Sequence, residues 1–406
     1  MAGPLAGVRI VDMTSVLMGP YCTQILGDLG ADIVKVEPPG GDLARGIGPE
    51  RHRGMGAIFL HSNRSKRSIA VDAKRAQGRA VVTALCRDAD VFVCSVRPRA
   101  MARLGLDAET LRAANPRLVY ASLVGYGQHG PYAARPAYDD LIQGAAGLPA
   151  LQALAGGGEP RYVPSAMVDR AVGLRAGIAI LAAVVEQRGS GQGQAIEVPM
   201  YEAMTEFVMS DHMQGRTFEP PVGPTGYQRH LDPGRRPYRT ADGHLCVLLY
   251  NDRHWETFMR RVGAGELWDG DARFRSVGAR AAAIAHVYDF VARTLAGRSS
   301  AEWIRLLDEA DIPWSPLNDP DTIFDDPHHV ATGFFSVREH PSEGPIRSMA
   351  VPDRYSRTPA EPERLAPRLG EHTVELLRES GHDDAAIAAL LADGTCIDGS
   401  ASGAGA

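Results

Sequence analysis

Short apolar runs alternate with segments of helical periodicity along the first third of the chain. They occur in the order 8–13 (strand), 19–30 (helix), 33–36 (strand), 76–89 (helix), 91–96 (strand), 107–114 (helix) and 118–124 (strand). Alternation of this kind predicts an α/β fold, with a doubly wound, Rossmann-like parallel sheet and helices on both faces. Ligands of such sheets bind beyond the carboxyl ends of the strands, which here are residues 14–18, 95–97 and 125–127.

Beyond residue 205, the sequence predicts a second, smaller domain, followed by a loop-rich segment that leads back to the large domain. Residues beyond about 205 lose helical and strand periods and gain glycine, proline and charge, before a strand pattern at 245–250 and three helical runs. We expect the segments 1–205 (large domain), 206–239 (linker), 240–325 (small α+β domain), 326–393 (return linker and final helices) and 394–406 (disordered tail). The tail is rich in small residues, which cannot bury enough apolar surface to fold.

Composition narrows the function classes. The chain has 406 residues, 44% of them hydrophobic, and a formal charge of −6 from 43 basic and 49 acidic side chains. A nucleic-acid protein would need a basic excess, and no apolar run is long enough to span a membrane. The N-terminus lacks a signal-peptide pattern, and the five cysteines form no Cys-x-x-Cys pair. We therefore expect a cytoplasmic protein without a metal site.

Asp169 is the most informative single residue. It follows an extended run, 161–168, and precedes an apolar, small-residue stretch, 171–185, that ends at Arg188-Gly189. This pattern predicts a helix with a carboxylate at its positive end, where it stays ionised and can face a ligand. A carboxylate held in this way can act as a nucleophile. The alternative is structural, because aspartate is also a favoured helix N-cap.

Other enzyme motifs are absent or incomplete. Glu37, at the end of the second predicted strand, would suit a ribose hydroxyl of a dinucleotide. The preceding turn, however, carries only Gly19 and no Gly-x-Gly-x-x-Gly, so the backbone cannot approach a pyrophosphate in the usual way. The chain also lacks a Gly-x-Ser-x-Gly nucleophile motif and a Walker loop. These observations argue against a nicotinamide enzyme, a serine hydrolase and a P-loop protein.

Positive charge gathers near the early strands despite the acidic total. A dense cationic turn is expected at 63–68, and further cations are Lys74, Arg97, Arg99 and Arg103. Local cations near strand ends favour an anionic ligand such as a phosphorylated cofactor, whereas the alternative is a solvated surface. Loop motifs at 126–131 and 137–140 would bring Tyr138 and Asp139 near Asp169.

Together these motifs resemble the class III coenzyme A transferases, the CaiB/BaiF family that includes formyl-CoA transferase and carnitine CoA-transferase. The matches include Gly7-Val-Arg-Ile-Val-Asp, Gly30-Ala-Asp-Ile-Val-Lys-Val-Glu, Asn63-Arg-Ser-Lys-Arg-Ser-Ile, Asn115-Pro-Arg-Leu-Val-Tyr, Gly125-Tyr-Gly-Gln-His-Gly-Pro, Ala137-Tyr-Asp, Asp169 and Arg188-Gly-Ser-Gly-Gln-Gly-Gln. The resemblance covers nearly the whole chain, and it is most specific in residues 1–200.

The resemblance implies a fold and an activity. The large domain would be formed by both chain ends, so that 326–393 includes its C-terminal part, and two copies would interlock as a homodimer. Asp169 would form mixed anhydride and aspartyl-CoA thioester intermediates while CoA passes from an acyl-CoA to a small carboxylic acid. Tyr138 and Asp139 would support it. No tightly bound cofactor is implied, because coenzyme A is a substrate. Its contacts would map onto Val16, Leu17, Met18, Val71, Lys74, Val96, Arg97 and Arg103.

Departures from the family pattern affect the substrate. Formyl-CoA transferases carry glutamine at Leu17, arginine at Pro38 and a glycine run near 230–239, so we expect an acid larger or more apolar than oxalate. Two alternatives stay open. An α-methylacyl-CoA racemase shares the fold but uses a His-Asp pair, and Tyr138 replaces that histidine poorly as a base. A non-catalytic relative would bind CoA without turnover.

Overall fold

The computed structural model describes residues 3–400 as two compact units. Unit 1 comprises Met1–Ala146, Pro164–Glu206 and Val330–Ala406, and unit 2 comprises Gly147–Val163 and Phe207–His329. Two helices, α9 (Met200–His212) and α16 (Pro327–Thr332), carry the chain across the boundaries. Unit 1 therefore draws on both ends of the chain. The predicted large segment, 1–205, differs in one respect, because residues 147–163 belong to unit 2.

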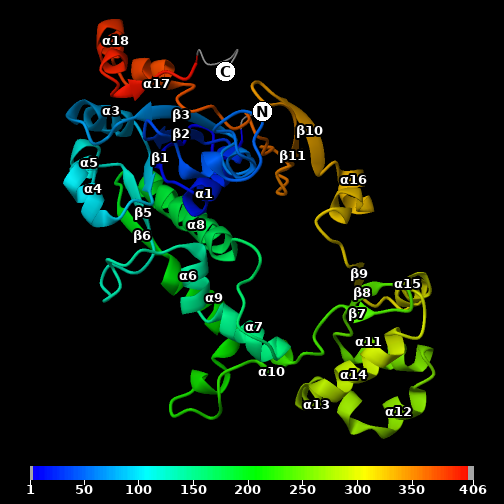
Figure 1. Ribbon diagram of the computed structural model, residues 1–406. Helices are drawn as coiled ribbons and strands as arrows, with labels where there is room; N and C mark the ends of the chain where they lie inside the picture. Colours follow the sequence, from blue (N-terminus) through cyan, green and yellow to red (C-terminus); the bar gives the residue numbers. More distant parts are fainter. Residues whose placement is uncertain (1–2, 401–406) are drawn as a thin grey trace. The chain divides into compact units, whose positions relative to one another are not determined.

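Unit 1 is built on a seven-stranded sheet in the order β12-β3-β2-β1-β4-β5-β6 (Figure 1). Its strands are β1 (Arg9–Met13), β2 (Asp32–Glu37), β3 (Lys66–Val71), β4 (Val91–Cys94), β5 (Val119–Val124), β6 (Ala195–Pro199) and β12 (Cys396–Ile397). The first six pair in parallel, and β12 pairs antiparallel with β3. The order 3-2-1-4-5-6 is that of a doubly wound nucleotide-binding sheet, so the predicted fold class is confirmed.

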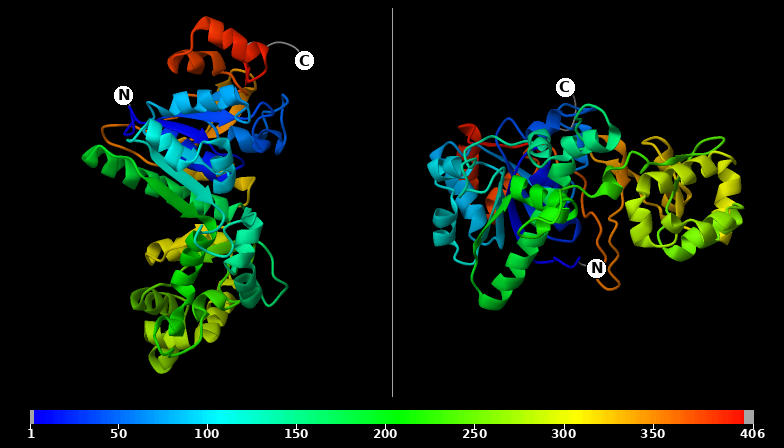
Figure 2. Two further views of the ribbon diagram at one scale, coloured as in Figure 1. Left: turned by 90° about the vertical axis from the view of Figure 1, so that its left-hand side faces the viewer. Right: turned by 90° about the horizontal axis from the view of Figure 1, so that it is seen from below.

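Helices cover both faces of this sheet, because its central strands are apolar on both sides. On one face α1 packs against α8, and on the other α3, α4, α5, α17 and α18 enclose the main core (Figures 1 and 2). The unit 1 helices are α1 (Met18–Asp28), α2 (Ala57–Leu60), α3 (Ala76–Cys86), α4 (Pro98–Leu104), α5 (Ala108–Ala114), α6 (Asp139–Ala145), α8 (Met167–Ser190), α17 (Thr373–Glu379) and α18 (Asp384–Ala392). A hairpin of β10 (Phe335–His340) and β11 (Gly344–Met349) completes the unit.

The cationic segment 63–68 is not the surface turn that its composition predicts. Its second half begins β3, whose six residues are all buried. The cations are neutralised inside the protein, since Arg64 pairs with Asp28 at 2.8 Å and Lys66 pairs with Asp12 at 3.1 Å. Arg67 likewise bridges carboxylates from β2 and α17. These side chains therefore serve the fold rather than an anionic ligand.

The C-terminal segment is more ordered than its composition predicts. Cys396 and Ile397 form β12, which adds to the outer edge of β3 opposite Val71 and Ala70. The backbone N–H of Asp72 also donates to the carbonyl of Thr395. Backbone pairing and the buried side chain of Cys396 hold a segment whose small residues offer little core. The prediction of disorder is thus wrong for residues 394–400, and residues 401–406 lie outside the described part of the chain.

Unit 2 is a small α+β unit with a core of its own. Buried aromatic residues, among them Trp255, Phe258 and Trp303, occupy its centre. Its elements are the strands β7 (Tyr238–Arg239), β8 (His244–Val247) and β9 (Trp314–Pro316), and the helices α7 (Leu148–Gly156), α10 (Gln228–Leu231), α11 (Asp252–Arg261), α12 (Gly265–Gly270), α13 (Val277–Ala282), α14 (Ile284–Leu295) and α15 (Ser300–Glu309). The three strands form a separate antiparallel sheet.

Across residues 3–400, every helix is too short or too polar to cross a membrane.

Candidate active site

A cavity of about 240 Å³ opens at the carboxyl edge of the unit 1 sheet. Its walls come from the loops that follow β1, β4 and β5, together with Asp169 from α8. This is the point where the strand order reverses from β1 to β4, and doubly wound sheets bind their ligands there. The three strand ends predicted from sequence, 14–18, 95–97 and 125–127, all contribute to the lining.

Asp169 lies in the first turn of α8, and it is not the helix cap. The helix starts at Met167, two residues earlier than Asp169, and the N-cap position belongs to Ala166, which makes no side-chain capping bond. The alternative prediction, that Asp169 is the helix N-cap, is therefore wrong. Its partly buried carboxylate lines the cavity at the positive end of a 24-residue helix. The helix ends at Ser190, with Gly191 in the left-handed conformation, slightly beyond the predicted stop.

Asp139 takes over the capping role from outside the helix. Its Oδ2 atom accepts a hydrogen bond of 2.9 Å from the backbone N–H of Asp169, one of the amides that the first helical turn leaves unpaired. Its Oδ1 atom accepts one of 2.6 Å from the side-chain amide of Gln143. Asp139 does not itself line the cavity, whereas the neighbouring Tyr138 does. Asp139 therefore holds the main chain at the start of α8, next to the Asp169 side chain.

The charge on Asp169 is held in an unfavourable setting. Burial, and secondly the negative charge of Asp139, raise the pKa of Asp169 to about 6, and the Arg170 guanidinium only partly opposes them. Arg170 itself lies over the ring of Tyr21, at 4.2 Å from the ring centre. A carboxylate with a pKa near 6 is still mostly ionised at neutral pH, and it is more basic than an ordinary aspartate. Both properties suit a nucleophile.

Close packing ties α8 to the first residue of α1, directly after the loop that follows β1. A Cβ atom on Gly173 would lie 2.8 Å from the carbonyl oxygen of Met18, so only glycine permits this approach of the two segments. Leu17 and Met18 are almost fully buried, yet they still contribute to the cavity wall. The cavity wall and the helix that carries Asp169 are therefore parts of one packed structure.

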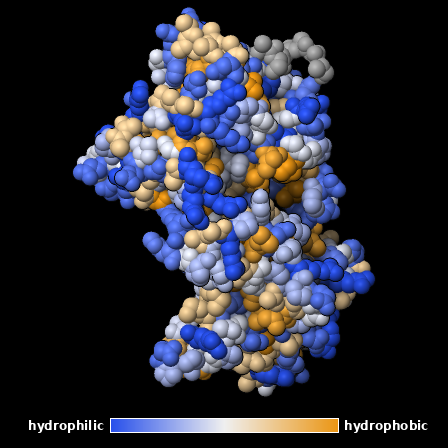
Figure 3. All heavy atoms as spheres, turned by 60° about the vertical axis from the view of Figure 1, so that its left-hand side comes forward, coloured by the Kyte–Doolittle hydropathy of each residue, from blue (hydrophilic) through white to orange (hydrophobic). Residues whose placement is uncertain are grey.

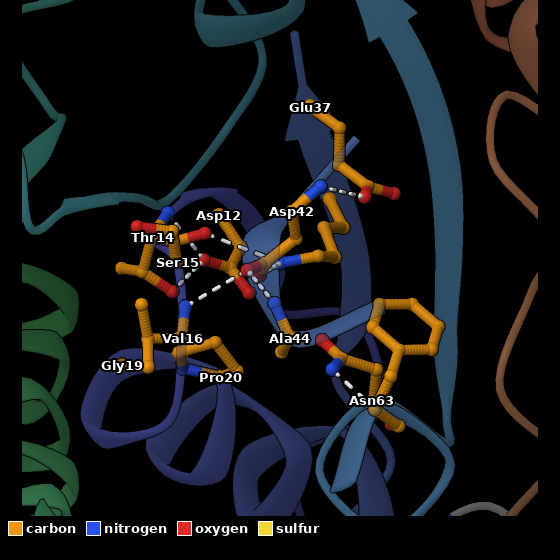
Figure 4. A network of polar contacts seen from close by, with 12 residues as sticks. Asp12, Thr14, Ser15, Val16, Gly19, Pro20, Glu37, Asp42, Ala44 and Asn63 are labelled. Atoms are coloured by element: carbon orange, nitrogen blue, oxygen red, sulfur yellow. Dashed lines mark hydrogen bonds and ion pairs between the residues drawn. The ribbon is translucent and has the colours of Figure 1, made fainter. Parts of the chain in front are cut away.

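Val16, in the same loop, has an unusual backbone. Its φ angle is +67°, a conformation that a β-branched residue rarely adopts. A hydrogen bond to a residue distant in sequence stabilises this conformation: the backbone N–H of Val16 donates to Oδ1 of Asp42 at 2.9 Å. Figure 4 shows this bond, together with the bonds that Asp42 receives from Ala44 and that Glu37 receives from Asp42. Strained residues that surrounding bonds hold in place are frequent at functional sites.

A buried ionic network fixes the base of this loop. Lys35 pairs with Asp42 at 2.8 Å and also donates to the carbonyl of Thr14. Burial alone would raise the pKa of Asp12, but Lys66 and Lys35, with the hydroxyls of Thr14 and Thr23, lower it to about 2. Asp12, Lys35 and Lys66 are all fully buried. A set of paired buried charges specifies a single geometry more strictly than apolar packing would.

Glu37 takes part in the fold rather than in dinucleotide binding. It forms a two-pronged ion pair with Arg45, at 2.7 Å for both bonds, and accepts a further bond from Ser68. A ribose hydroxyl would have to displace these partners.

The residues expected to contact CoA fall into three groups: some line the cavity, some are exposed outside its lining, and some lie in or beside the main core. Val16, Leu17, Met18 and Arg97 line the cavity together with Tyr138 and Asp169. Lys74 and Arg103 are exposed, follow β3 and β4 respectively, and form no ion pair within residues 3–400. Val96 packs on the edge of the main core, and Val71 is sealed inside it. The side chain of Val71 therefore cannot reach a ligand in this arrangement.

Two polar residues of the cavity were not among the candidates from sequence. Gln128 and Arg135 both lie in the loop between β5 and α6, and Arg135 stacks on Tyr132 at 3.8 Å from the ring centre. Gln128 belongs to a loop motif recognised in the sequence, but a motif alone does not reveal which of its side chains turn inward. The sequence around Arg135 has the composition of a surface loop, so it does not indicate that Arg135 borders a cavity.

Comparison with known proteins identifies the family. Residues 5–373 match the family described as CoA-transferase family III. The chain is 33% identical to succinate–glutarate CoA-transferase of Agrobacterium fabrum, over 93% of this chain and 95% of that protein. It is 31% identical to human succinyl-CoA:glutarate CoA-transferase, over 96% of this chain and 89% of that protein.

The fold agrees with this relationship. A crystal structure of a CaiB/BaiF family protein from Brucella suis superposes with a TM-score of 0.76 at 30% identity, and the match covers 94% of this chain and all of that chain. The sequence resemblance, the doubly wound sheet and the carboxylate in its switch-point cavity thus point to one assignment. The chain belongs to CoA-transferase family III and is a class III CoA-transferase.

Proposed function

We propose that this enzyme transfers coenzyme A from an acyl-CoA to a free carboxylic acid through covalent intermediates on Asp169. The observation that carries this assignment is the position of Asp169: it lines the cavity, it has no capping duty, and its pKa is near 6. Such a group is ionised at neutral pH and sufficiently basic to attack a thioester.

The chemistry proceeds through four exchanges at carbonyl carbons. The Asp169 carboxylate attacks the thioester carbon and expels CoA thiolate, leaving a mixed anhydride. The thiolate attacks the Asp169 acyl carbon, so the donor leaves as a free carboxylate and an aspartyl-CoA thioester remains. The acceptor carboxylate then attacks this thioester and again releases the thiolate. Attack of the thiolate on the acceptor carbon gives the new acyl-CoA and free Asp169. Each step forms one acyl bond and breaks one.

The fold supplies the conditions that these steps need. A carboxylate is a weak nucleophile in water, but fixed beside its target it gains an effective molarity of roughly 10⁵ M or more in favourable cases. The hydrogen bond from Asp169 to Asp139 and the close packing at Gly173 provide such fixation. Water must be excluded, since every intermediate is hydrolysable. The partly enclosed cavity supports that requirement.

For coenzyme A we propose a path along the loops after β1, β3 and β4. Arg97 borders the cavity. Lys74 and Arg103, which follow β3 and β4 in the sequence, are exposed and form no ion pair within residues 3–400. These cations suit the phosphates of CoA. Val16, Leu17 and Met18 suit the pantetheine arm, because they present apolar surface and main-chain groups to the cavity.

The acceptor is proposed to be an acid larger than oxalate. The names of the two relatives described above specify succinate and glutarate, which are dicarboxylates. Arg135 of the cavity has no carboxylate partner within the described chain, so it could pair with the second carboxylate of such an acid. This choice of acid rests on the relatives and on Arg135 together.

We further propose that two copies associate. Apolar side chains of α8 are left on the surface, with Leu174, Ile178 and Val185 exposed by 50%, 69% and 73%. Figure 3 shows that apolar groups lie among hydrophilic ones on one face of the molecule. Their spacing of i, i+4 and i+11 places them on one face of the helix, and an exposed apolar face favours a protein partner. Light scattering should give a mass of two chains; a single-chain mass would contradict the dimer.

A trapping experiment tests the covalent mechanism. The protein is mixed with succinyl-CoA and hydroxylamine, and its peptides are examined by mass spectrometry. Asp169 should carry a hydroxamate, only when acyl-CoA is present. With glutarate in place of hydroxylamine, glutaryl-CoA should form. The Asp169→Ala variant should do neither, while Asp140→Asn, which changes an exposed carboxylate on α6, should do both.

Two results would overturn the proposal. One is wild-type exchange by Asp169→Ala. The other is epimerisation of a chiral 2-methylacyl-CoA without CoA transfer to any acid in a panel, which would assign a racemase.

A further inference from the structure

Unit 2 contains a second cavity, of about 270 Å³, which has no part in the chemistry proposed for Asp169. It lies between the end of β8 and the helices α11, α13 and α14, with α10 at its side. Val247, Leu249 and Trp255 form an apolar wall, and Tyr250 and Tyr288 add aromatic surface. Its volume is just below the range of roughly 300–1,000 Å³ typical of ligand pockets, so any ligand must be small.

The charged side chains that line this cavity are all basic. Its lining within the described chain contains two arginines and no aspartate or glutamate. Arg280 is already engaged, because it pairs with Asp252 and donates to the carbonyl of Phe274 at 2.6 Å. Arg229 forms no ion pair within residues 3–400. A cavity with one engaged and one available guanidinium selects for a negative ligand.

Arg229 is held in place without being neutralised. Its Nε atom donates to the hydroxyl of Tyr288 at 3.4 Å, its side chain also hydrogen-bonds Tyr227, and its guanidinium lies 6.0 Å from the ring centre of Tyr250. It is half-buried, on the short helix α10. A guanidinium offers five donors in a planar fork, so hydrogen bonds to two tyrosine hydroxyls still leave donors for a carboxylate.

We propose that this cavity is a second ligand site, which binds a small carboxylate with a flat apolar body. The carboxylate pairs with Arg229, and the body lies against Val247, Leu249 and Trp255. Apolar walls with one well-placed charged group are the usual composition of small-molecule sites. The site needs neither Asp169 nor coenzyme A.

Tryptophan fluorescence can detect this binding directly. All four tryptophans of the chain, Trp255, Trp268, Trp303 and Trp314, belong to unit 2, and Trp255 lines the cavity. Phenylacetate is titrated into the full-length protein, and phenylacetamide, which has the same shape without the charge, is titrated in parallel. Loss of a charge-assisted hydrogen bond should weaken binding of the amide by about 10- to 100-fold. Equal affinities for the two compounds would overturn the proposal.

Variants locate the bound molecule. Arg229→Gln should weaken phenylacetate binding by a similar factor, whereas Arg253→Gln, an exposed arginine that pairs with Asp311, should leave the Kd unchanged. Ala281→Phe adds bulk at an exposed position of the cavity rim and should abolish the response. Thermal unfolding of each variant confirms that it is folded. An unchanged Kd in Arg229→Gln or Ala281→Phe contradicts the site.

One last comparison separates this site from the cavity of unit 1. If phenylacetate instead bound as a substrate analogue beside Asp169, Arg135→Gln would weaken binding and Arg229→Gln would not. That outcome overturns the second site and leaves CoA transfer untouched. Conversely, Asp169→Ala should bind phenylacetate as the wild type does, even if it has lost all transferase activity.

Discussion

Asp139 accepts a hydrogen bond from the backbone of Asp169 and, through its charge, raises the pKa of the Asp169 side chain. One carboxylate therefore fixes the main chain of the proposed nucleophile and makes its side chain more basic. The two effects can be separated, because asparagine keeps the accepting oxygen and removes the charge.

The Asp139→Asn variant should shift the pH dependence of the reaction. The ionised form of Asp169 is the nucleophile, so kcat/KM for the acyl-CoA should fall as pH drops through about 6. Without the charge of Asp139, the pKa falls toward that of an ordinary aspartate, and the acidic limb moves to lower pH. Initial rates between about pH 4 and 8 measure the shift. Asp140→Asn is the matched control, and an unmoved limb would contradict the electrostatic role.

The raised pKa of Asp169 also predicts a gain of stability when its charge is removed. Ionisation is harder in the folded than in the unfolded chain, so it destabilises the folded state above about pH 6. This penalty declines as pH falls below 6 and is absent below the ordinary value of 3.8. Asp169→Asn should therefore raise the free energy of unfolding at about pH 8 by roughly 1–2 kcal/mol, after allowance for partial exposure and for the lost helix-end attraction.

Denaturant unfolding at about pH 8 and pH 4 measures this difference. The gain should disappear at the lower pH. A variant that is less stable than the wild type at both pH values would show that the Asp169 charge stabilises the fold.

The buried pair Asp12–Lys66 should behave as a unit. Replacing only one partner, by Asp12→Asn or Lys66→Met, leaves the other charge buried and should cost about 3–5 kcal/mol of stability. The double variant should lose much less than the sum of the two single losses. Urea unfolding measures all three. The exposed pair Arg175–Glu206 is the control, and its removal should change stability by less than about 1 kcal/mol. Additive losses for the buried pair would contradict the coupling.

The cations at the strand ends should affect affinity rather than chemistry. If Lys74 and Arg103 hold the phosphates of CoA, then Lys74→Gln and Arg103→Gln should each raise KM for the acyl-CoA about tenfold and leave kcat nearly unchanged. Added salt should narrow the difference from the wild type. Arg293→Gln, which changes an exposed arginine of unit 2 that pairs with Asp289, is the control. Normal KM values in both variants would remove these residues from the CoA site.

The sequence predicts those parts of the fold that depend on local pattern. Strands β1, β2, β4 and β5 are predominantly apolar, and each is found within a few residues of its expected place. Strand β3 was missed because it begins with cations, which are buried only because partners distant in sequence neutralise them. Strand β6 lies at an edge and is partly exposed, so it has no apolar run.

The candidate site shows the same division. Asp169 and the strand-end loops could be found from sequence, because a helix start and a strand end have local signatures. The φ angle of Val16 could not, since a β-branched residue disfavours it and only the bond to Asp42, 26 residues away, sustains it. The position of Arg135 could not be predicted for a similar reason, because the path of an irregular loop places it at the cavity.

Strand β12 has a consequence for biosynthesis. Strand β12 is synthesised after all other strands of the main sheet and after the whole of unit 2. Until then, the β3 edge at Ala70 and Val71 is unpaired in the nascent chain. Open edges invite pairing with other chains. A message truncated before codon 396 would leave that edge permanently bare, and aggregation, rather than loss of a catalytic group, would be its first defect.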